Sequence, residues 1–243
     1  MIWHDQLKPG SFCKLKELYI TQCQSLEKIF LPNTLRTLRS LEELRISNCQ
    51  STEEVFAMQG IDVQDTEEVF AMQGIDVQDT DHTVQLKYLD LQSLQNLKYI
   101  WSLDCRAIFR FKNLCEVKVG DCNSLKSLFP ASVAKYLEQL TRLEIYQCGV
   151  EEVVEKEESE TSESNFAFPR LTFLRLEQLP ELRSFYRGKC KLRCPLLKEL
   201  KICNCDKLKI FGSEDTSQQT PFFIDEVRAT NTLCPLSLLL WML

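Results

Sequence analysis

One motif recurs seven times along the chain and constrains the fold more than any other feature. Each copy follows the pattern L-x-x-L-x-Φ-x-x-C/L, where Φ is a large apolar residue and Val replaces the second Leu in one copy. The copies begin at Leu15, Leu41, Leu86, Leu114, Leu140, Leu171 and Leu197. In a pleated strand, the apolar residues of such a copy point inward and the residues between them point to solvent. A unit repeated every 20 to 50 residues or so builds a solenoid, so we predict that the seven strands stack into a parallel sheet.

The spacing of the copies singles out a duplicated segment. Successive copies start 26, 45, 28, 26, 31 and 26 residues apart. Residues 52–65 and 66–79 are identical, and removing one of these fourteen-residue copies shortens the interval of 45 to 31. Val55-Phe56 and Val69-Phe70 fit equally well the position where Ile29-Phe30 closes the first coil. We predict that one of the two pairs fills this position and that the tandem segment 52–79 forms a surface loop.

The ninth position of the motif predicts a buried ladder. It carries Cys23, Cys49, Cys122, Cys148 and Cys205, with Leu94 and Leu179 in the two other copies. Because Cys exchanges with Leu here, a small apolar side chain inside a turn explains the pattern better than thiol chemistry does. About six apolar side chains per coil, at about 2 kcal/mol each for full burial, give a core that grows with every repeat.

Composition limits the cellular compartment and the kinds of partner that we expect for this chain. The 243 residues carry a net charge of −6, so the counterion release that drives nucleic-acid binding offers no advantage, and we expect no nucleic-acid partner. The start of the chain lacks the pattern of a signal peptide, and the apolar stretch "LSLLLWML" is far shorter than the roughly 20 residues of a membrane span. We therefore expect a cytoplasmic protein without a membrane span, whose twelve Cys are free thiols.

Three segments carry a family resemblance. The sequences "IWHDQLKPGSFCKLKELYITQC", "SLKSLFPASVAKYLEQLTRLEI" and "FAFPRLTFLRLEQLPELRSFY" resemble the C-terminal repeat region of plant intracellular disease-resistance proteins of the coiled-coil, nucleotide-binding, leucine-rich-repeat class. The resemblance covers residues 1–211. It implies an α/β leucine-rich-repeat solenoid of about seven repeats, a curved horseshoe with a parallel β-sheet on its concave face and loops and short helices on its convex side.

Two segments depart from the repeat pattern. The acidic run within residues 151–165 occupies an extended coil, where we expect a solvated loop. The alternative is that this run binds a basic surface of an adjoining nucleotide-binding domain. Residues 212–243 are expected to form a polar linker and an irregular C-terminal tail.

No catalytic constellation is visible in the sequence. His4 and His82 are the only histidines and stand in no catalytic or metal-binding motif, and no glycine-rich phosphate motif occurs. Four thiols have a spacing that suggests zinc: Cys190, Cys194, Cys203 and Cys205. The repeat already accounts for two of them, because Cys205 belongs to the buried ladder and Cys194 to a second apolar column. We therefore expect no enzyme, no cofactor and no metal.

The solvent side of the predicted sheet is the candidate binding surface. Its strand positions alternate basic and acidic side chains, interrupted by aromatic residues, which suits a protein partner. The predicted protein-binding residues on this concave face are Tyr19, Arg45, Tyr88, Asp90, Lys118, Glu144, Tyr146, Phe173, Arg175 and Lys201. The structural alternative is that these charges only keep the sheet soluble and in register.

The resemblance implies a non-catalytic recognition module, a fragment of a plant immune receptor acting in the defence response. It would sense a pathogen effector or a guarded host protein and regulate a nucleotide-binding switch. The nucleotide-binding domain of the same receptor is then a further partner. Two alternatives remain open: a substrate-recognition adaptor of a ubiquitin ligase, and a truncated relic without function, which the duplication and a start within a repeat would fit.

Overall fold

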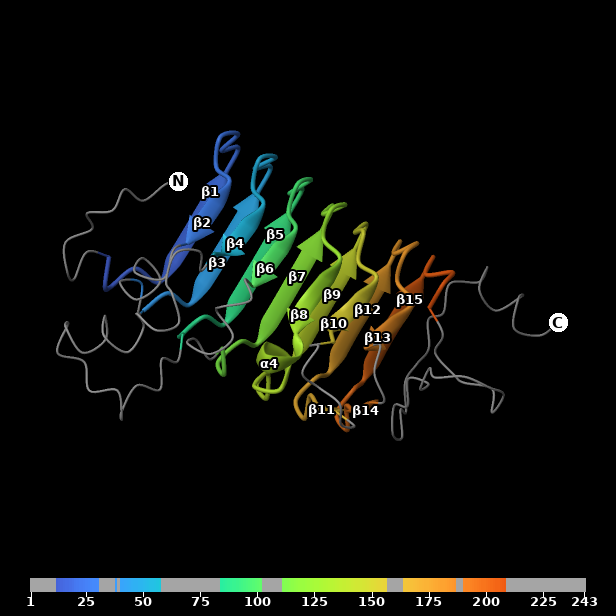
Figure 1. Cartoon of the computed structure of the whole chain (residues 1–243). Helices are drawn as coiled ribbons and strands as arrows, with labels where there is room; N and C mark the ends of the chain where they lie inside the picture. Colours follow the sequence, from blue (N-terminus) through green and yellow to red (C-terminus); the bar gives the residue numbers. More distant parts are fainter. Residues whose placement is uncertain are drawn as a thin grey trace, which may run out of the picture.

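A seven-stranded parallel sheet dominates the computed structural model, which describes residues 12–30, 38, 40–57, 84–101, 111–156, 164–186 and 190–208. The strands are β1 (Glu17–Thr21), β3 (Glu43–Ser47), β5 (Tyr88–Gln92), β7 (Glu116–Gly120), β9 (Arg142–Tyr146), β12 (Phe173–Glu177) and β15 (Glu199–Cys203), in this order across the sheet (Figure 1). Each strand comes from one copy of the motif, which confirms the predicted solenoid. The expected tail, residues 212–243, lies outside the described residues.

The strands form because the motif alternates inward and outward side chains. In β3, Leu44 and Ile46 are fully buried, whereas Arg45 between them is exposed. Leu44 pairs with Leu18 of β1 on one side and with Leu89 of β5 on the other. The other neighbours pair in the same register, so equivalent residues of all seven coils form continuous rows across the sheet.

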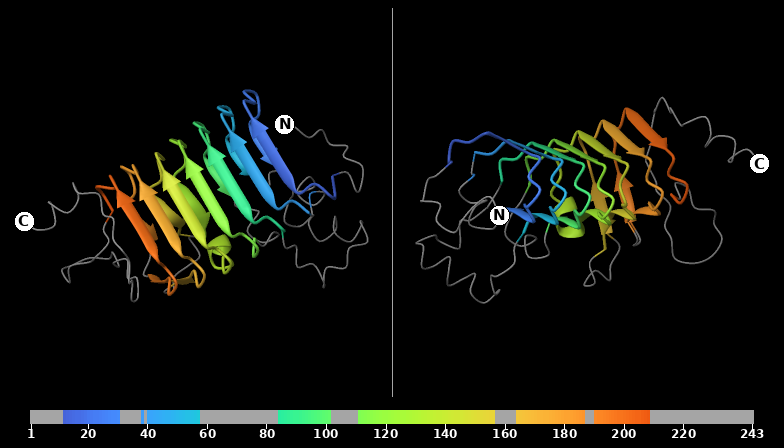
Figure 2. Two further views of the ribbon diagram at one scale, coloured as in Figure 1. Left: turned by 180° about the vertical axis from the view of Figure 1, so that it is seen from behind. Right: turned by 90° about the horizontal axis from the view of Figure 1, so that it is seen from above.

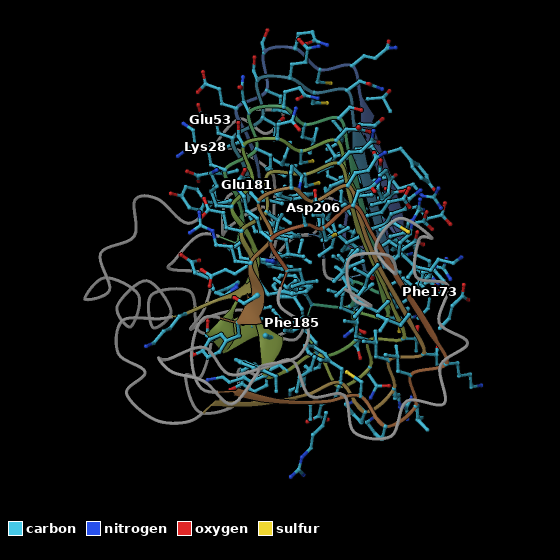
Figure 3. All side chains as sticks on the ribbon, turned by 90° about the vertical axis from the view of Figure 1, so that its right-hand side faces the viewer. Lys28, Glu53, Phe173, Glu181, Phe185 and Asp206 are labelled. Atoms are coloured by element: carbon cyan, nitrogen blue, oxygen red, sulfur yellow. The ribbon has the colours of Figure 1, made fainter. Side chains whose placement is uncertain are left out.

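The return side of the coils carries short strands that the sequence analysis did not predict. They form three small parallel sheets: β2 (Lys28–Phe30), β4 (Glu54–Phe56) and β6 (Tyr99–Trp101); β8 (Ser127–Pro130), β10 (Glu152–Glu155) and β13 (Ser184–Tyr186); and β11 (Ser164–Ala167) with β14 (Cys190–Arg193). The expected short helix is represented in the described residues by α4 (Ala131–Ala134). In a view along the stack, Lys28 and Glu53 lie on the side opposite to Phe173 of the large sheet (Figure 3). The right view of Figure 2 shows the large sheet and the short return-side strands from above. Strands of three or four residues are too short to show a period in the sequence.

The acidic run is only in part the loop that we expected. Residues 152–155 form β10 instead, with Val153 and Val154 fully buried. Strand β10 pairs with β8 and β13, so the two apolar side chains outweigh the glutamates on either side of them. Residues 157–163 lie outside the described residues.

The first copy of the duplicated segment fills the coil-closing position. Val55 and Phe56 of β4 are 0% and 1% exposed, and the Phe56 ring stacks 5.6 Å from Phe30 and 5.0 Å from Trp101, centroid to centroid. Thr52 is also buried and donates a 2.8 Å hydrogen bond from Oγ1 to a backbone carbonyl of the preceding coil. The start of segment 52–79 is therefore core and not loop. The second copy, with Val69-Phe70, lies outside the described residues.

A left-handed turn follows every strand of the large sheet. The residue before the ninth motif position has a φ between 52° and 58° in all seven coils, and it is never Gly: Gln22, Asn48, Ser93, Asp121, Gln147, Gln178 and Asn204. In the first six coils its N–H donates to a carbonyl of the next coil, as in the 3.0 Å bond from Asn48 N to Gln92 O. The turn aims the next side chain inward, and Cys49, Cys122 and Cys148 are buried as predicted. Towards the two ends of the stack, Cys23 and Cys205 are half-buried.

Candidate recognition face

The solvent side of the large sheet, called the strand face below, presents three rows of side chains. The middle row is Tyr19, Arg45, Asp90, Lys118, Glu144, Arg175 and Lys201. The first row is Glu17, Glu43, Tyr88, Glu116, Arg142, Phe173 and Glu199, and the last row is Thr21, Ser47, Gln92, Gly120, Tyr146, Glu177 and Cys203. All ten predicted residues thus lie on one face, and their part in binding stays a prediction.

Aromatic side chains are accessible at one end of the strand face and covered at the other. Tyr19 is 52% exposed and Tyr88 is 43% exposed. Phe173 is only 8% exposed, so our expectation that it is accessible to a partner is wrong. The guanidinium of Arg142 lies 3.7 Å above the centre of the Phe173 ring, and the Lys201 ammonium lies 5.3 Å from it. Two cations from the flanking strands therefore cover this ring.

Glu144 is the second predicted residue that is buried, at 8% exposure. Arg142 Nε donates to its carboxylate at 2.6 Å, and Arg175 Nη1 donates to it at 3.2 Å. Burial is the largest single influence on the pKa of Glu144 and raises it, but the hydrogen bonds and charges of the two arginines together outweigh burial. The pKa consequently lies below the usual value, and Glu144 is an ionised link between strands β9 and β12.

Acid should weaken this link. Because the pKa of Glu144 is lower in the folded than in the unfolded chain, its stabilising contribution is complete above the unfolded value of about 4.3 and is lost as the pH falls through the folded value. Glu144→Gln keeps the shape without the charge, so the variant should lose less stability on acidification than the parent. Urea midpoints at about pH 6 and about pH 3 measure this difference. Equal acid-induced losses in both proteins would contradict the assignment.

The last row contains a cross-strand contact that the sequence analysis missed. Tyr146 donates a 2.6 Å hydrogen bond from its hydroxyl to Gln92 Oε1, two strands away. Its ring passes over Gly120, where an added Cβ would lie 2.4 Å from ring atom Cε2. Gly at a strand position between two long side chains is the signal that could have indicated this contact.

Tyr19 is fixed at its hydroxyl and open at its ring. The hydroxyl oxygen lies 3.0 Å from a carboxylate oxygen of Glu43 and from one of Glu17, which share its single proton. The bond to Glu43 is the main cause that raises the pKa of Tyr19 to about 12, followed by burial and Glu17. Arg45, which is ion-paired with Glu43, has its guanidinium 5.6 Å from the ring centre. An exposed ring whose orientation is already set loses little side-chain entropy on binding.

A hollow of about 200 Å³ opens near the middle of the strand face. Its lining is Arg45, Tyr88, Leu89, Asp90, Glu116, Val117, Lys118, Arg142 and Glu144. Strands β5 and β7 form its floor at Leu89 and Val117, whose side chains point into the core, and charged groups and the Tyr88 ring surround it. Five of the predicted residues line this hollow, whereas Glu116 and Arg142 were not among them.

Two of the candidate zinc cysteines, Cys194 and Cys205, occupy apolar positions of the repeat. Cys194 is buried, and burial raises the pKa of its thiol to about 12. Burial also raises the pKa of Cys205 to about 11, which disfavours the thiolate that a metal needs. Among the described residues, no group of three or more His, Cys, Asp or Glu side chains is placed to hold a metal ion. The side chain of Cys190 lies outside them.

Stacked coils with one parallel strand each, an L-x-x-L-x-Φ-x-x-C/L core and a polar strand face define a leucine-rich-repeat protein. The family described as plant disease resistance protein RPS2-like, leucine-rich repeats, matches residues 1–149 and 137–214. The chain belongs to this family, as the resemblance in its sequence implied.

No curated protein matches the chain. The crystal structure of an internalin from Listeria monocytogenes is similar at 15% identity over 73% of this chain and 69% of its own, but its TM-score of 0.22 is too low to inform fold or function. In the part of the chain that the structure describes, no helix combines the length and apolar character of a membrane span.

Proposed function

We propose that the strand face binds a protein ligand, with its centre on the N-terminal half of the sheet. The observation that carries this proposal is the pair of exposed aromatic rings, Tyr19 and Tyr88, the second of which borders the hollow. Aromatic and Arg side chains contribute most of the energy at protein interfaces, and surrounding charges contribute specificity.

The C-terminal half of the strand face is less suited to be the centre. Tyr146 has Lys118 at 5.8 Å and Arg175 at 5.1 Å from its ring centre, and Phe173 is covered by its own two cations. A ligand would have to displace these cations before it could contact the rings. We therefore assign this half a supporting role, in which its ion-paired network keeps the face rigid and contributes polar contacts at the rim.

The ligand that we propose is a pathogen effector or a guarded host protein. Membership of the plant disease-resistance family supports this choice. In a full receptor, occupation of the strand face would regulate a nucleotide-binding switch, and the nucleotide-binding domain is a further candidate for contact with the repeats. The module would act in the cytoplasm and without catalysis of its own.

Two tyrosines on opposite sides of the coil give a matched test. Tyr88 lies on the strand face, and Tyr99 of β6, which is 51% exposed, lies on the return side. Tyr88→Ala should weaken binding of an effector, host protein or nucleotide-binding domain about thirtyfold, as expected for an interface residue worth about 2 kcal/mol. Tyr99→Ala should leave the Kd unchanged. A loss with Tyr99→Ala alone, measured by calorimetry on the same ligand, would place the binding surface on the return side.

A further inference from the structure

The lining of the hollow carries three basic side chains, Arg45, Lys118 and Arg142, and three acidic ones, Asp90, Glu116 and Glu144. Two of its three cations are already ion-paired, Arg45 with Glu43 and Arg142 with Glu144. The third, Lys118, has its ammonium 5.8 Å from the centre of the Tyr146 ring. The basic side chains of the lining are thus largely engaged by the protein itself.

Two carboxylates of the lining, those of Asp90 and Glu116, form no ion pair in the part of the chain that the structure describes. Within the described residues, the Glu116 side chain makes neither a hydrogen bond nor an ion pair. Asp90 accepts a 2.7 Å hydrogen bond from the Gln92 amide and has no ion pair in this part of the chain. Asp90 lies between Arg45 and Lys118 in the middle row. Glu116 has Arg142 beside it in the first row, but that guanidinium is bonded to Glu144, so Glu116 is the carboxylate of the lining that remains for a cation of the ligand.

The surroundings of Glu116 suit a planar cation in particular. Glu116 pairs with Tyr88 in neighbouring positions of the first row, and the Tyr88 ring is 43% exposed. A guanidinium binds a carboxylate through two parallel hydrogen bonds and also stacks on aromatic rings. The hollow of about 200 Å³ is smaller than the roughly 300 Å³ at which small-molecule pockets begin, so its size fits one side chain.

We propose that the hollow receives one arginine side chain of the protein ligand. Its guanidinium stacks on Tyr88 and bonds to the carboxylate of Glu116, with Asp90 adding attraction from the middle row. The aliphatic part of the arginine lies over strands β5 and β7 at Leu89 and Val117. This inference rests on the proposed function, because it names a feature that the ligand must present to the strand face.

Capped amino acids test the hollow without a known ligand. The full chain is titrated with Nα-acetyl-arginine methylamide, with the citrulline analogue, which has the same shape but no charge, and with the glutamate analogue, while amide NMR shifts are recorded. Arginine should shift the amides of Tyr88 to Asp90 and of Glu116 to Lys118 in a saturable way. Citrulline should bind about tenfold more weakly, because it loses the charge-assisted hydrogen bonds. Shifts with glutamate that exceed those with arginine, or none with arginine, would overturn the proposal.

A pair of isosteric variants tests whether Glu116 is the residue that binds the arginine. Glu116→Gln should weaken arginine binding about tenfold. Glu199→Gln is the matched control: Glu199 lies in the same row but outside the hollow, with Lys201 Nζ 2.7 Å from its carboxylate. It should leave arginine binding unchanged, and equal effects of the two variants would reject Glu116 as the contact.

The two proposals can fail separately. Specific arginine binding in the hollow, together with a ligand whose Kd does not respond to Tyr88→Ala, would reject the strand face as the docking surface. A ligand that needs Tyr88, together with no arginine binding in the hollow, would reject only the arginine.

Discussion

Phe56→Ala should lower the free energy of unfolding by about 3–5 kcal/mol, even though the same phenylalanine occurs again fourteen residues later. Phe56 is 1% exposed, and its ring contacts Phe30, Trp101 and Phe111 at centroid distances of 5.6, 5.0 and 5.1 Å. Removing the ring opens a cavity in the aromatic column that joins three coils. Urea unfolding, followed by circular dichroism, measures the loss.

Phe70→Ala is the internal control for this substitution. Phe70 is the identical residue of the second copy, and the position between β2 and β6 is already occupied by β4 of the first copy. We expect a change within about 0.5 kcal/mol for this variant. A small loss with Phe56→Ala, or similar losses with both variants, would mean that the second copy can take over the position.

Gly149→Ala should cost about 2–4 kcal/mol, the second large effect that we expect. Gly149 lies in the turn between β9 and β10 and donates a 3.2 Å hydrogen bond from its N–H to Cys122 O. An added Cβ would lie 2.0 Å from the backbone oxygen of Asn123 in the preceding coil. Since that oxygen belongs to the backbone, relief of the clash requires the two coils to move apart.

Gly120→Ala is the matched comparison, because the three atoms nearest to its added Cβ all belong to side chains, those of Tyr146 and Gln92. These side chains can move at the cost of their mutual hydrogen bond, so we expect a loss of about 1 kcal/mol. Thermal and urea unfolding of the two variants rank them. A Gly120→Ala loss as large as that of Gly149→Ala would show that the coil contact at Asn123 is softer than its geometry indicates.

The strands and the buried ladder could be predicted because they follow from a period. Leu44 and Ile46 recur at fixed spacing, and the exchange of Cys148 with Leu179 at one motif position indicates burial whatever the turn looks like. The choice between Phe56 and Phe70 could not be made from identical segments. In the structure the first copy continues directly from the turn after β3, where Thr52 N donates to Cys49 O at 3.1 Å.

Which residues lie on the strand face could be predicted from the sequence, but which of them are exposed could not. The covering of Phe173 depends on the reach of Arg142 and Lys201 from the flanking strands, which only the register determines. The burial of Glu144 likewise follows from its contacts with Arg142 and Arg175. The return-side strands were missed because they are too short to show a period, and β10 was hidden by the acidic residues beside its valines.

Site-specific photo-crosslinking tests the strand face as a recognition surface most directly. Benzoylphenylalanine replaces either Tyr88 or Tyr99, tyrosines of similar exposure on opposite sides of the coil, and each protein is irradiated in extract from pathogen-challenged leaf. We predict a discrete crosslinked protein from position 88 and none from position 99. The same adduct in equal yield from both positions, or an adduct from position 99 alone, would contradict a strand face that binds the ligand.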